Sequence, residues 1–329
     1  MRMIVCTKYG SPEVLKFKEA DKPVPGDDEV LIKLKATTVT AADFRIRSFT
    51  IPSSYRLLAR FALGFNKPRQ DILGMEFSGE IESRGKNVNK FQKGDYVTGS
   101  TGHHMGTYAE YFTMPVKDSG VAIAEKPGNL TGEDSAAIAF GGLTALFFLR
   151  KANIKKGQKV LIYGASGSVG TYAVQLAKHF GAEVTGVCST SNLELVQSLG
   201  ADKVIDYTKE NFIKNDEKYD VIFEAVGKAL YSDCIKSLKK RGILLHAVAT
   251  PGVSLKMFWT SLTTRKKTVG GELKLKSEDL TYLKELIEAD KIKPVIDRYY
   301  SFEQMVEAHR YVDKGHKKGN VVICINNTN

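Results

Sequence analysis

A glycine-rich segment between a short apolar strand and an amphipathic helix constrains the fold more than any other feature of this sequence. Lys159–Tyr163 (KVLIY) has the pattern of a short buried strand. The spacing G-x-x-G-x-x-G follows it, and then come apolar residues at i, i+3, i+4 and i+7, namely Ala173, Leu176, Ala177 and Phe180. A strand, a glycine turn and a helix in this order are typical of a loop that binds the pyrophosphate of a dinucleotide.

Each part of this segment has a physical role in that interpretation. Glycines permit a tight turn, let backbone N–H groups approach the phosphates, and let the helix pack closely on the strand. The N-terminus of the helix adds unpaired N–H donors and partial positive charge. The alternative is an ordinary turn of glycine and serine. The dinucleotide interpretation predicts cofactor contacts from Gly164, Ala165, Ser166, Gly167, Ser168, Val169 and Gly170.

Strand and helix patterns continue to alternate after this loop. Further strands are predicted at 183–188, 203–206, 219–223 and 243–248, and a second helix at 193–199. Alternation of this length predicts an α/β fold with a parallel, doubly wound sheet, the Rossmann architecture.

The first third of the chain is β-rich instead. Residues 29–36 (EVLIKLKA) alternate apolar and lysine side chains, and a strand is also predicted at 107–114. Near the C-terminus, helices are predicted at 277–289 and about 302–312, and a last strand at 320–325. We expect that last strand to return to the β-rich part. The predicted domains are therefore 1–124 with 276–329, and 125–275.

The end of the strand at 183–188 bears on which dinucleotide is bound. Sites that prefer NAD place an Asp or Glu about 20 residues after the glycine loop, where it accepts from the ribose 2′-OH. Here that place is taken by Ser189, followed by Thr190. No carboxylate in this stretch repels a 2′-phosphate, and the two hydroxyls could donate to it. The sequence therefore favours NADPH over NADH, although this stretch contains no Arg or Lys, the stronger phosphate partners.

Composition restricts the class of protein further. The chain has 329 residues with 43% hydrophobic and 26% charged residues, as expected for two globular domains. The longest uncharged apolar stretch, 135–149, is shorter than the ~20 residues of a membrane span. The four cysteines lie far apart, and no secretory segment is recognisable, so we expect a soluble cytoplasmic protein. The net charge of +11 indicates either an anionic partner or a solvated basic surface.

Seven sequence blocks, in order, resemble the medium-chain dehydrogenase/reductase superfamily, specifically its zinc-independent quinone oxidoreductase and enoyl-reductase-like branch. The resemblance covers nearly the whole chain. The blocks are LGMEFSGEI (73–81), KGDYV (93–97), GTYAEY (106–111), GGLTA (141–145), GASGSVG (164–170), LGADKVIDY (199–207) and GHKKGNVVI (315–323). The resemblance implies that the β-rich part is a GroES-like catalytic domain, completed by the C-terminal segment.

The resemblance also implies that this chain binds no zinc. Zinc-dependent alcohol dehydrogenases of the superfamily hold the metal with a Cys, a His and a second Cys or an Asp. The matching positions here are Thr40, Met75 and approximately Gly141, which are not zinc ligands. The four-cysteine loop of those relatives is missing, and His103–His104 has no evident third ligand. Metal ligands are therefore predicted to be absent.

The family pattern places several more residues near the cofactor or the acceptor. Thr144 matches a threonine beside the nicotinamide, and Tyr207 a position near the adenosine phosphate. The segments that follow the strands at 219–223 and 243–248 are expected to line the cofactor site because ligands bind at the carboxyl ends of parallel strands. These residues are Val226, Gly227, Ala247, Val248 and Ala249. Asn320 stands where the family often has Lys or Arg, although Lys317 and Lys318 are adjacent.

The family lines its catalytic cleft at positions that correspond to Thr40, Asp43 and Arg45. The alternative for Asp43 is that it only holds its loop. Residues 44–70 carry six Lys or Arg, no acidic residue and several large apolar side chains. This segment is either an apolar lid with basic edges, able to meet an anionic ligand or a membrane surface, or a helix packed on its own domain.

These observations predict an NADPH-dependent oxidoreductase that transfers hydride to a quinone or an α,β-unsaturated carbonyl compound. Without zinc, the best acceptors are those that delocalise the negative charge which arrives with the hydride. One alternative is a zinc-free alcohol or ketone oxidoreductase, and another is an NADPH-binding module that interacts with RNA or protein without relevant turnover. The expected partners are an apolar small-molecule acceptor and, from the family, a second copy paired through 267–273. Nucleic acid is not expected, because no module of exposed aromatic and basic residues is recognisable.

Overall fold

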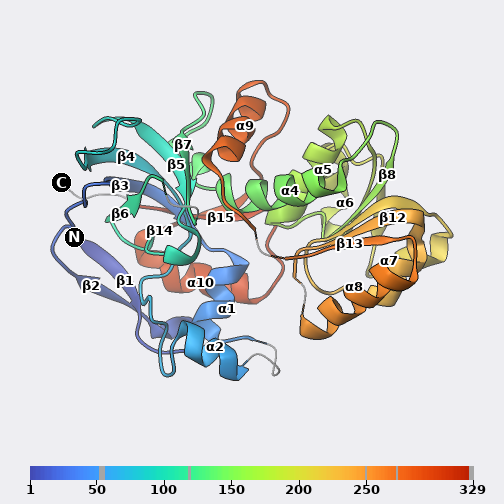
Figure 1. The fold of residues 1–329 in the computed structure, drawn as a ribbon. Coiled ribbons are helices and arrows are strands. Elements are labelled where there is room, and N and C mark those ends of the chain that lie inside the picture. The colour runs from blue at the N-terminus through green and yellow to red at the C-terminus, as the bar shows by residue number, and fades with distance from the viewer. Residues whose placement is uncertain (52–55, 118–119, 249, 272, 326–329) are drawn as a thin grey trace. The chain divides into compact units, whose positions relative to one another are not determined.

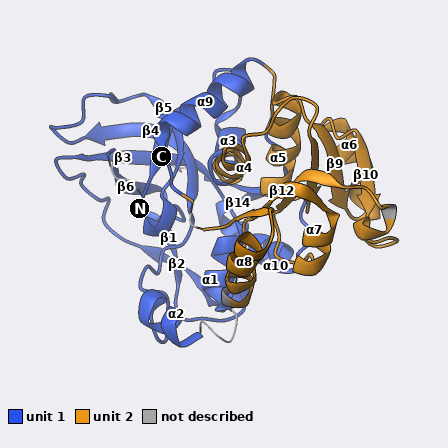
Figure 2. Cartoon of the chain, turned by 45° about the vertical axis from the view of Figure 1, so that its right-hand side comes forward, with its two compact units in different colours: residues 1–140, 274–289, 294–329 blue, residues 141–273, 290–293 orange. Residues whose placement is uncertain are grey.

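The computed structural model describes residues 1–51, 56–117, 120–248, 250–271 and 273–325. The chain forms two compact units (Figure 2). Unit 1 comprises residues 1–140, 274–289 and 294–329, and unit 2 comprises residues 141–273 and 290–293. The domain boundaries predicted from the sequence, after residues 124 and 275, stay a prediction, as do the roles assigned to the two domains.

Unit 2 is built on a six-stranded sheet in the order β10-β9-β8-β11-β12-β13, with every neighbouring pair parallel. Strands β8, β12 and β13 of this sheet are labelled in Figure 1. Its strands are β8 (Lys159–Tyr163), β9 (Glu183–Cys188), β10 (Lys203–Asp206), β11 (Tyr219–Glu224), β12 (Leu238–His246) and β13 (Lys267–Val269). Its helices are α4 (Ala139–Ala152), α5 (Ser168–His179), α6 (Leu193–Ser198), α7 (Tyr231–Ser237) and α8 (Pro251–Thr263). The predicted α/β fold with a doubly wound parallel sheet is confirmed.

The burial of the central strands explains why the apolar runs were recognisable. Val160, Leu161 and Ile162 of β8 are all fully buried, as expected for a parallel strand covered by helices on both faces. Of the periodic apolar residues, Ala173, Leu176 and Ala177 of α5 are buried as well, whereas Phe180, directly after the helix, is half-buried. Strand β12 begins earlier than its apolar part indicated, because Lys239–Arg241 form an exposed, polar beginning of the strand.

Unit 1 contains a sheet with the path β14-β15-β3-β4-β5-β7, with β6 paired to β3, and a hairpin-like pair β1-β2. The strands are β1 (Arg2–Cys6), β2 (Leu15–Glu19), β3 (Glu29–Thr38), β4 (Glu76–Arg84), β5 (Tyr96–Ser100), β6 (Tyr111–Pro115), β7 (Ala122–Glu125), β14 (Ile296–Ser301) and β15 (Asn320–Cys324). The helices are α1 (Ala41–Ser48), α2 (Arg56–Leu63), α3 (Gly132–Ser135), α9 (Ser277–Glu288) and α10 (Met305–Asp313).

The C-terminal strand completes this sheet, as the sequence predicted. β15 pairs antiparallel with β3 and parallel with β14. The strand expected at 107–114 is wrong in its first half, because only Tyr111–Pro115 form β6. Thr107 and Tyr108 lie in a loop instead, where their N–H groups donate to the carbonyls of Gly74 and Leu73.

A buried polar chain ties α1 to α10 and to the N-terminal segment inside unit 1. The Arg47 side chain is fully buried, and its guanidinium donates to both carboxylate oxygens of Asp313 at 2.6 Å and to the Gly10 carbonyl at 2.5 Å. Its Nε donates to Nδ1 of His309 at 3.2 Å, so Nε2 of His309 carries the proton and donates to the Tyr108 hydroxyl at 3.1 Å. Burial and the charge of Arg47 lower the pKa of His309 to about 3, so this imidazole is neutral.

This chain predicts the effect of Asp313→Ala. The substitution leaves the buried guanidinium of Arg47 without its carboxylate, so we expect the free energy of unfolding of unit 1 to fall by about 3 kcal/mol. Urea unfolding followed by circular dichroism measures the change. Arg310→Ala is the matched control, because its pair with Glu13 is exposed and contributes less than about 1 kcal/mol. Equal effects of the two substitutions would contradict the structural role given to the buried chain.

Candidate functional site

The carboxyl ends of the strands of unit 2 meet at one edge of its sheet. From β8 the chain proceeds to β9 and β10 on one side, and then to β11, β12 and β13 on the other. The strand order therefore reverses between β8 and β11. Ligands of open parallel sheets bind at such a reversal, outside the carboxyl ends of the strands. The predicted residues of this unit all belong to segments that follow these strand ends or to α4.

The loop from Gly164 to Gly170 needs glycine at both of its ends for steric reasons. Gly164 has φ +84°, and a Cβ on it would overlap the Val226 side chain in the loop that follows β11. A Cβ on Gly170 would overlap the Gly164 carbonyl oxygen. The N–H groups of Gly164 and Ala165 both donate to the Val187 carbonyl at 3.0 Å. The loops after β8 and β11 are thus held in direct contact at the reversal point.

The middle glycine has a different environment. Gly167 is the N-cap of α5 with extended backbone, φ −81° and ψ 176°, and no side chain caps the helix. The nearest atom to a Cβ built on Gly167 is the Gly164 carbonyl oxygen, at 3.6 Å. The protein therefore leaves room for a methyl group here, and the first turn of α5 presents N–H groups that no side chain satisfies. Such a bare helix N-terminus suits a phosphate group.

Helix α4 lies against the start of α5. A Cβ on Gly141 would lie 2.5 Å from the Ser168 hydroxyl, so glycine allows this close approach. The Ser168 hydroxyl is buried and has no hydrogen-bond partner among the described residues. Thr144, predicted beside the nicotinamide, is buried one turn further along α4 on the same side as Gly141. An unsatisfied hydroxyl at the first residue of α5 is consistent with a polar ligand there.

An amide that the sequence analysis missed connects the glycine loop to the end of β9. Asn192 is buried, and its Nδ2 donates to the hydroxyls of Ser166 and Ser189, each at 3.1 Å. Its Oδ1 has no partner in the part of the chain that the structure describes. Its position directly before the second predicted helix was the available signal, because Asn is common at helix starts. Ser189, a predicted contact, is therefore positioned by Asn192.

A carboxylate lies near the end of β9, where the sequence indicated none. β10 pairs with β9 in parallel, and its last residue, Asp206, accepts a hydrogen bond from the Thr190 hydroxyl. Asp206 also accepts from the N–H and hydroxyl of Thr208, and the Lys209 ammonium lies 3.7 Å away. The hydroxyls of Thr190 and Thr208 lower the pKa of Asp206. The expectation that nothing here repels a 2′-phosphate is therefore corrected: a carboxylate from the next strand lies beside Thr190.

Tyr207 directly follows Asp206. Its N–H donates to the Cys188 carbonyl at 3.0 Å, and its side chain is 48% exposed. The ring centroid lies 6.5 Å from that of Tyr163, the last residue of β8. An exposed aromatic ring therefore lies directly after β10, and its role near the adenosine phosphate stays a prediction.

A buried carboxylate that the sequence analysis did not single out holds the loop after β11. Glu224 is fully buried, and it accepts from the N–H of Gly227 at 2.6 and 2.8 Å and of Lys228 at 3.1 Å. These bonds fix the backbone of Val226 and Gly227, which were predicted to contact the cofactor. An acidic residue at the end of the apolar run YDVIFE was the available signal.

The end of β12 lies against the same carboxylate. The Nε2 atom of His246 is 3.7 Å from the Glu224 carboxylate, and burial lowers the pKa of this histidine. The N–H of Ala247 donates to the Glu224 carbonyl at 2.9 Å, and the Val248 side chain faces Gly227. The structure thus brings Ala247 and Val248 beside the loop after β11, whereas Ala249 lies outside the described residues.

The residues predicted to line the catalytic cleft belong to unit 1, on α1. Thr40 and Asp43 form a capping box: the Asp43 carboxylate accepts from the N–H and hydroxyl of Thr40, and the Thr40 hydroxyl accepts from the Asp43 N–H. The other Asp43 oxygen accepts from the Gly74 N–H at 3.0 Å. Burial raises the pKa of Asp43. Asp43 therefore holds α1 and the Gly74 loop, and Arg45 lies partly buried one turn before the end of α1.

Asn320 also lies in unit 1 and is buried. Its Nδ2 donates to the Val295 carbonyl at 3.1 Å, so the side chain is bonded to the neighbouring backbone. Lys317 lies three residues before Asn320 in the chain, and burial lowers the pKa of Lys317 to about 8.

The electrostatic partner of Lys317 is Glu76. Burial raises the pKa of Glu76 to about 7, and its carboxylate accepts from the Thr38 hydroxyl at 2.5 Å and from the Phe140 N–H at 2.6 Å. Two groups that ionise near neutrality, Glu76 and Lys317, thus belong to unit 1, and Glu76 directly follows Met75 in the sequence. Burial, which a sequence does not state, is what distinguishes them from other Glu and Lys residues.

The positions that match zinc ligands in other dehydrogenases carry no donor set for zinc. The Thr40 hydroxyl is engaged with Asp43, Met75 is buried, and Gly141 has no side chain. Among the described residues, no group of three or more His, Cys, Asp or Glu could hold a metal ion. His103 and His104 are exposed in a short helical turn.

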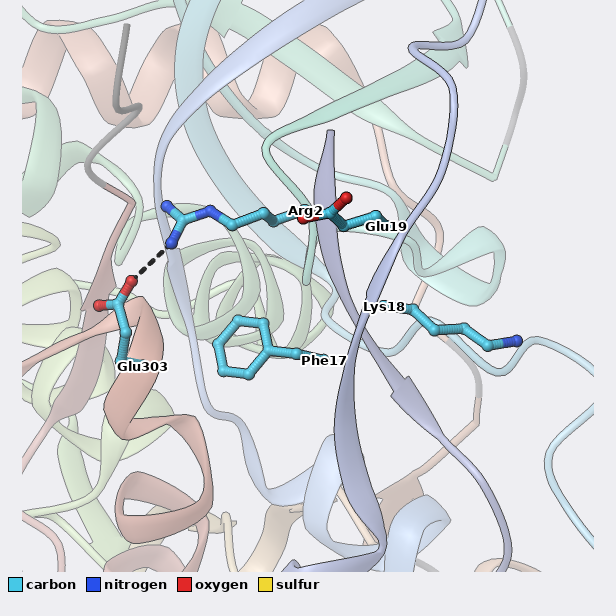
Figure 3. Close-up of a pocket in the computed structure, with 5 residues that line it drawn as sticks. All are labelled: Arg2, Phe17, Lys18, Glu19 and Glu303. Carbon is cyan, nitrogen blue, oxygen red and sulfur yellow. Dashed lines mark hydrogen bonds and ion pairs between the residues drawn. The ribbon is translucent and has the colours of Figure 1, made fainter.

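Unit 1 also has a surface groove of about 290 Å³, lined by Arg2, Phe17, Lys18, Glu19 and Glu303 (Figure 3). The Arg2 guanidinium bonds to Glu303 and to Glu110, each at 2.8 Å. Because these charges neutralise each other and none of the predicted site residues lines the groove, it does not compete with the strand-end site of unit 2.

Comparison with known proteins agrees with this geometry. Two family models match, "Alcohol dehydrogenase GroES-like domain" over residues 26–125 and "Zinc-binding dehydrogenase" over residues 199–323. The 2-methylene-furan-3-one reductase of Solanum lycopersicum is 34% identical over 96% of this chain and 77% of its own length. The chloroplastic NADPH-dependent alkenal/one oxidoreductase of Arabidopsis thaliana is 30% identical over 98% and 79% of the two chains.

A solved quinone oxidoreductase from Coxiella burnetii has a similar structure, with a TM-score of 0.88, 29% identity and 99% coverage of both chains. No helix among the described residues is both long and apolar enough to cross a bilayer. Because the Arabidopsis relative is named as chloroplastic, the cytoplasmic location stays a prediction.

The order of the strands, the glycine loop and the relatives lead to one assignment. The chain belongs to the medium-chain dehydrogenase/reductase superfamily, in its zinc-independent quinone oxidoreductase and enoyl-reductase-like branch, and it is an NAD(P)H-dependent oxidoreductase.

Proposed function

We propose that this enzyme uses NADPH, in preference to NADH, to reduce a quinone or an α,β-unsaturated carbonyl compound. The observation that supports a dinucleotide is the glycine loop with its bare helix N-terminus at Gly167, next to the unsatisfied Ser168 hydroxyl. The residues present therefore fit a dinucleotide. The preference for NADPH rests on Ser189 and Thr190, which stand where NAD sites place an Asp or Glu. When bound, the nicotinamide cofactor supplies the hydride.

In this proposal, the residues of unit 2 divide the cofactor between them. The N–H groups at the start of α5 hold the pyrophosphate, and Asn192 with Ser189 holds the ribose of the adenosine half. Thr144 and the segments after β11 and β12 position the nicotinamide half, with Glu224 keeping the Val226–Gly227 backbone in place. Tyr207 covers the adenosine end. The remaining predicted contacts, from Thr190 and Asn320, stay proposals as well, although the Thr190 hydroxyl and the Asn320 amide already have protein partners.

In the proposal, the residues that contact the acceptor belong to unit 1. We assign this role to Thr40, Asp43 and Arg45, which lie at or on α1. The mutual hydrogen bonds of Thr40 and Asp43 set the position of the helix, and Arg45 takes no part in these bonds. Among the described residues, no group of His, Cys, Asp or Glu could hold a zinc ion that would polarise a simple carbonyl, so the acceptors favoured are those that delocalise charge. The names of the relatives, which include an alkenal/one oxidoreductase and a quinone oxidoreductase, support this class.

Experiments distinguish two alternative functions from the proposed one. A zinc-free alcohol or ketone oxidoreductase would oxidise secondary alcohols with NADP⁺. A cofactor-binding module that acts through RNA or protein would bind NADPH without turnover. The homodimer through the β13 edge is a further prediction, which sedimentation velocity measures.

The first prediction of this proposal is turnover. We expect NADPH oxidation, followed by absorbance, with a simple quinone or with an alkenal, and no loss of rate after treatment with a metal chelator. Secondary alcohols with NADP⁺ should give little turnover. Activity that requires added zinc, or oxidation of alcohols alone, would contradict the proposal.

Gly167→Ala tests the cofactor site directly. The backbone at Gly167 accepts alanine and a methyl group there has room, so the stability should stay within about 0.5 kcal/mol of wild type. The methyl group would project toward the bound phosphates, so we expect NADPH affinity to fall at least about tenfold, which is 1.4 kcal/mol, by isothermal titration calorimetry.

Two variants serve as controls for Gly167→Ala. Gly128→Ala in unit 1, whose Cβ would make only an ordinary 3.6 Å contact with the Glu288 carboxylate, should change neither stability nor affinity. Gly170→Ala should instead destabilise unit 2, because its Cβ meets the Gly164 carbonyl. Undiminished NADPH binding by Gly167→Ala would place the pyrophosphate elsewhere.

The choice between NADPH and NADH is tested at Asp206. In wild type, we expect NADPH to bind at least about tenfold more tightly than NADH. Asp206→Asn removes the negative charge beside Thr190 while its amide can still bond the hydroxyls, so the preference for NADPH should increase further, by a few-fold. The measurement is titration of both cofactors to both proteins. A preference for NADH in wild type would show that the carboxylate of Asp206, rather than Ser189, decides the specificity.

A further inference from the structure

The amide of Asn192 joins two hydroxyls that come from different strand ends of unit 2. Ser166 belongs to the glycine loop after β8, and Ser189 directly follows β9. The Nδ2 atom of Asn192 lies 3.1 Å from each of the two hydroxyl oxygens. The asparagine is buried, whereas both serines are partly exposed. We call these three residues the Asn192 cluster.

The orientation of the Asn192 amide follows from its burial. The nitrogen donates one hydrogen to each serine, and among the described residues only the Oδ1 oxygen of this amide lacks a partner. The reverse orientation would bury two N–H groups where that single oxygen now lies. Buried N–H groups without a partner are rarer in proteins than carbonyl oxygens without one. Asn192 therefore donates to both serines.

This arrangement makes donors of the two serine hydroxyls. A hydroxyl that accepts from the amide keeps its own hydrogen for a different acceptor. Within the described part of the chain, the Ser166 side chain makes no other hydrogen bond, and the Ser189 hydroxyl has only the Ser191 hydroxyl besides, at 3.4 Å. Two hydroxyl hydrogens are thus available between the glycine loop and the end of β9.

The carboxylate beside the Asn192 cluster is already occupied by its own neighbours. Asp206 accepts from the Thr190 hydroxyl and from the N–H and hydroxyl of Thr208. The Thr190 hydroxyl spends its hydrogen on this bond, so it does not compete with the serines as a donor to a ligand. The end of β9 therefore offers a ligand the hydrogens of Ser166 and Ser189, and the nearby carboxylate oxygens are engaged.

We propose that Asn192 is the positioning residue that makes the enzyme select NADPH, because its amide turns the Ser166 and Ser189 hydroxyls into a pair of donors for the 2′-phosphate. The inference rests on the proposed function and names the side chain that decides the choice of cofactor. Phosphate oxygens only accept hydrogen bonds, so two oriented donors fit them and no Arg or Lys is needed in this stretch. The 2′-OH of NADH would also need an acceptor, and the Asn192 cluster presents none.

The two donors are tested by isothermal titration calorimetry with NADPH and NADH. Ser166→Ala and Ser189→Ala should each weaken NADPH binding about tenfold and leave the affinity for NADH within about twofold of wild type. Unchanged NADPH affinity in both variants would overturn the inference. An equal loss for NADPH and NADH would overturn it as well, because the serines would then bind the pyrophosphate that both cofactors share.

The positioning role is tested at Asn192 itself. The Asn192 side chain does not cap α6, so its replacement leaves the start of that helix intact. Asn192→Leu frees the serine hydroxyls, and the ratio of NADPH to NADH affinity should fall about tenfold. Asn192→Asp should lower this ratio at least about thirtyfold, because the carboxylate accepts from both hydroxyls and adds a negative charge beside the phosphate. A merely structural role would lower both affinities together and leave their ratio unchanged, which would overturn the inference.

A double substitution separates positioning from direct contact. When Asn192 is already Leu, adding Ser189→Ala should weaken NADPH binding by less than about threefold, because the hydroxyl is no longer oriented. A full tenfold loss in that background would show that Ser189 acts without Asn192. Thermal unfolding and NADH affinity report whether the variants are folded, and the two serine variants carry the test if Asn192→Leu does not fold.

Asn211→Leu is the matched control. Asn211 is another asparagine of unit 2 at the start of a short helix, and its amide bonds to the Ile213 N–H and to Asp233. This substitution should leave the ratio of NADPH to NADH affinity unchanged, and a fall equal to that of Asn192→Leu would overturn the inference.

Failure of the inference and failure of the proposed function give different results. Adenosine 2′,5′-bisphosphate and adenosine 5′-monophosphate probe the adenosine half without nicotinamide and without turnover. If neither these nucleotides nor NADPH binds to wild type, the proposed function fails and the inference with it. If NADPH binds more tightly than NADH, and the bisphosphate more tightly than the monophosphate, in wild type and in all the Ser166, Ser189 and Asn192 variants alike, only the inference is overturned.

Discussion

Unit 2 depends on the absence of side chains at two glycines. Without a Cβ at Gly164, the loop after β8 can touch Val226 in the loop after β11, and without one at Gly170, α5 can begin directly over the turn. These contacts join the two halves of the sheet at the point where the strand order reverses. The backbone that would hold a dinucleotide is therefore shaped by close packing, and the N-terminus of α5 has no side-chain cap because its N-cap residue is Gly167.

Buried charges position the other segments around that turn and inside unit 1. The Glu224 carboxylate fixes the loop after β11 through backbone N–H groups, Asp43 caps α1, and Arg47 links α1 to α10. In each case a charged group removed from water is stabilised by several hydrogen bonds, which is the condition under which burial of charge is tolerated. Residues of the types that do chemistry elsewhere thus serve here to hold backbone segments in place.

The uneven distribution of charge gives the molecule distinct surfaces. The segment 234–271, which contains α8, carries eight Lys or Arg residues and no acidic residue, whereas the groove lined by Arg2 and Glu303 is neutralised by its own ion pair. At the end of β9 negative and positive charges are more nearly balanced, because Asp206 and Lys209 both lie near the predicted phosphate site. Neither the sign of a surface nor the charge felt at a site follows from the net charge of +11 alone.

The sequence by itself determined the fold class, most strand positions, the glycine loop and the family, because these are encoded in local periodicity and in blocks of contiguous residues. It misplaced the beginning of β6, since Thr107 and Tyr108 bond to the distant residues Leu73 and Gly74. Only the tertiary structure brought Asp206 to Thr190, Glu224 to the Gly227 loop and Asn192 between two serines. It also decided which faces are buried, including the burial that moves the pKa values of Glu76 and Lys317 toward neutrality. The physical reason is that pairing between strands, burial and local electrostatics depend on contacts between residues far apart in the chain, which no local pattern records.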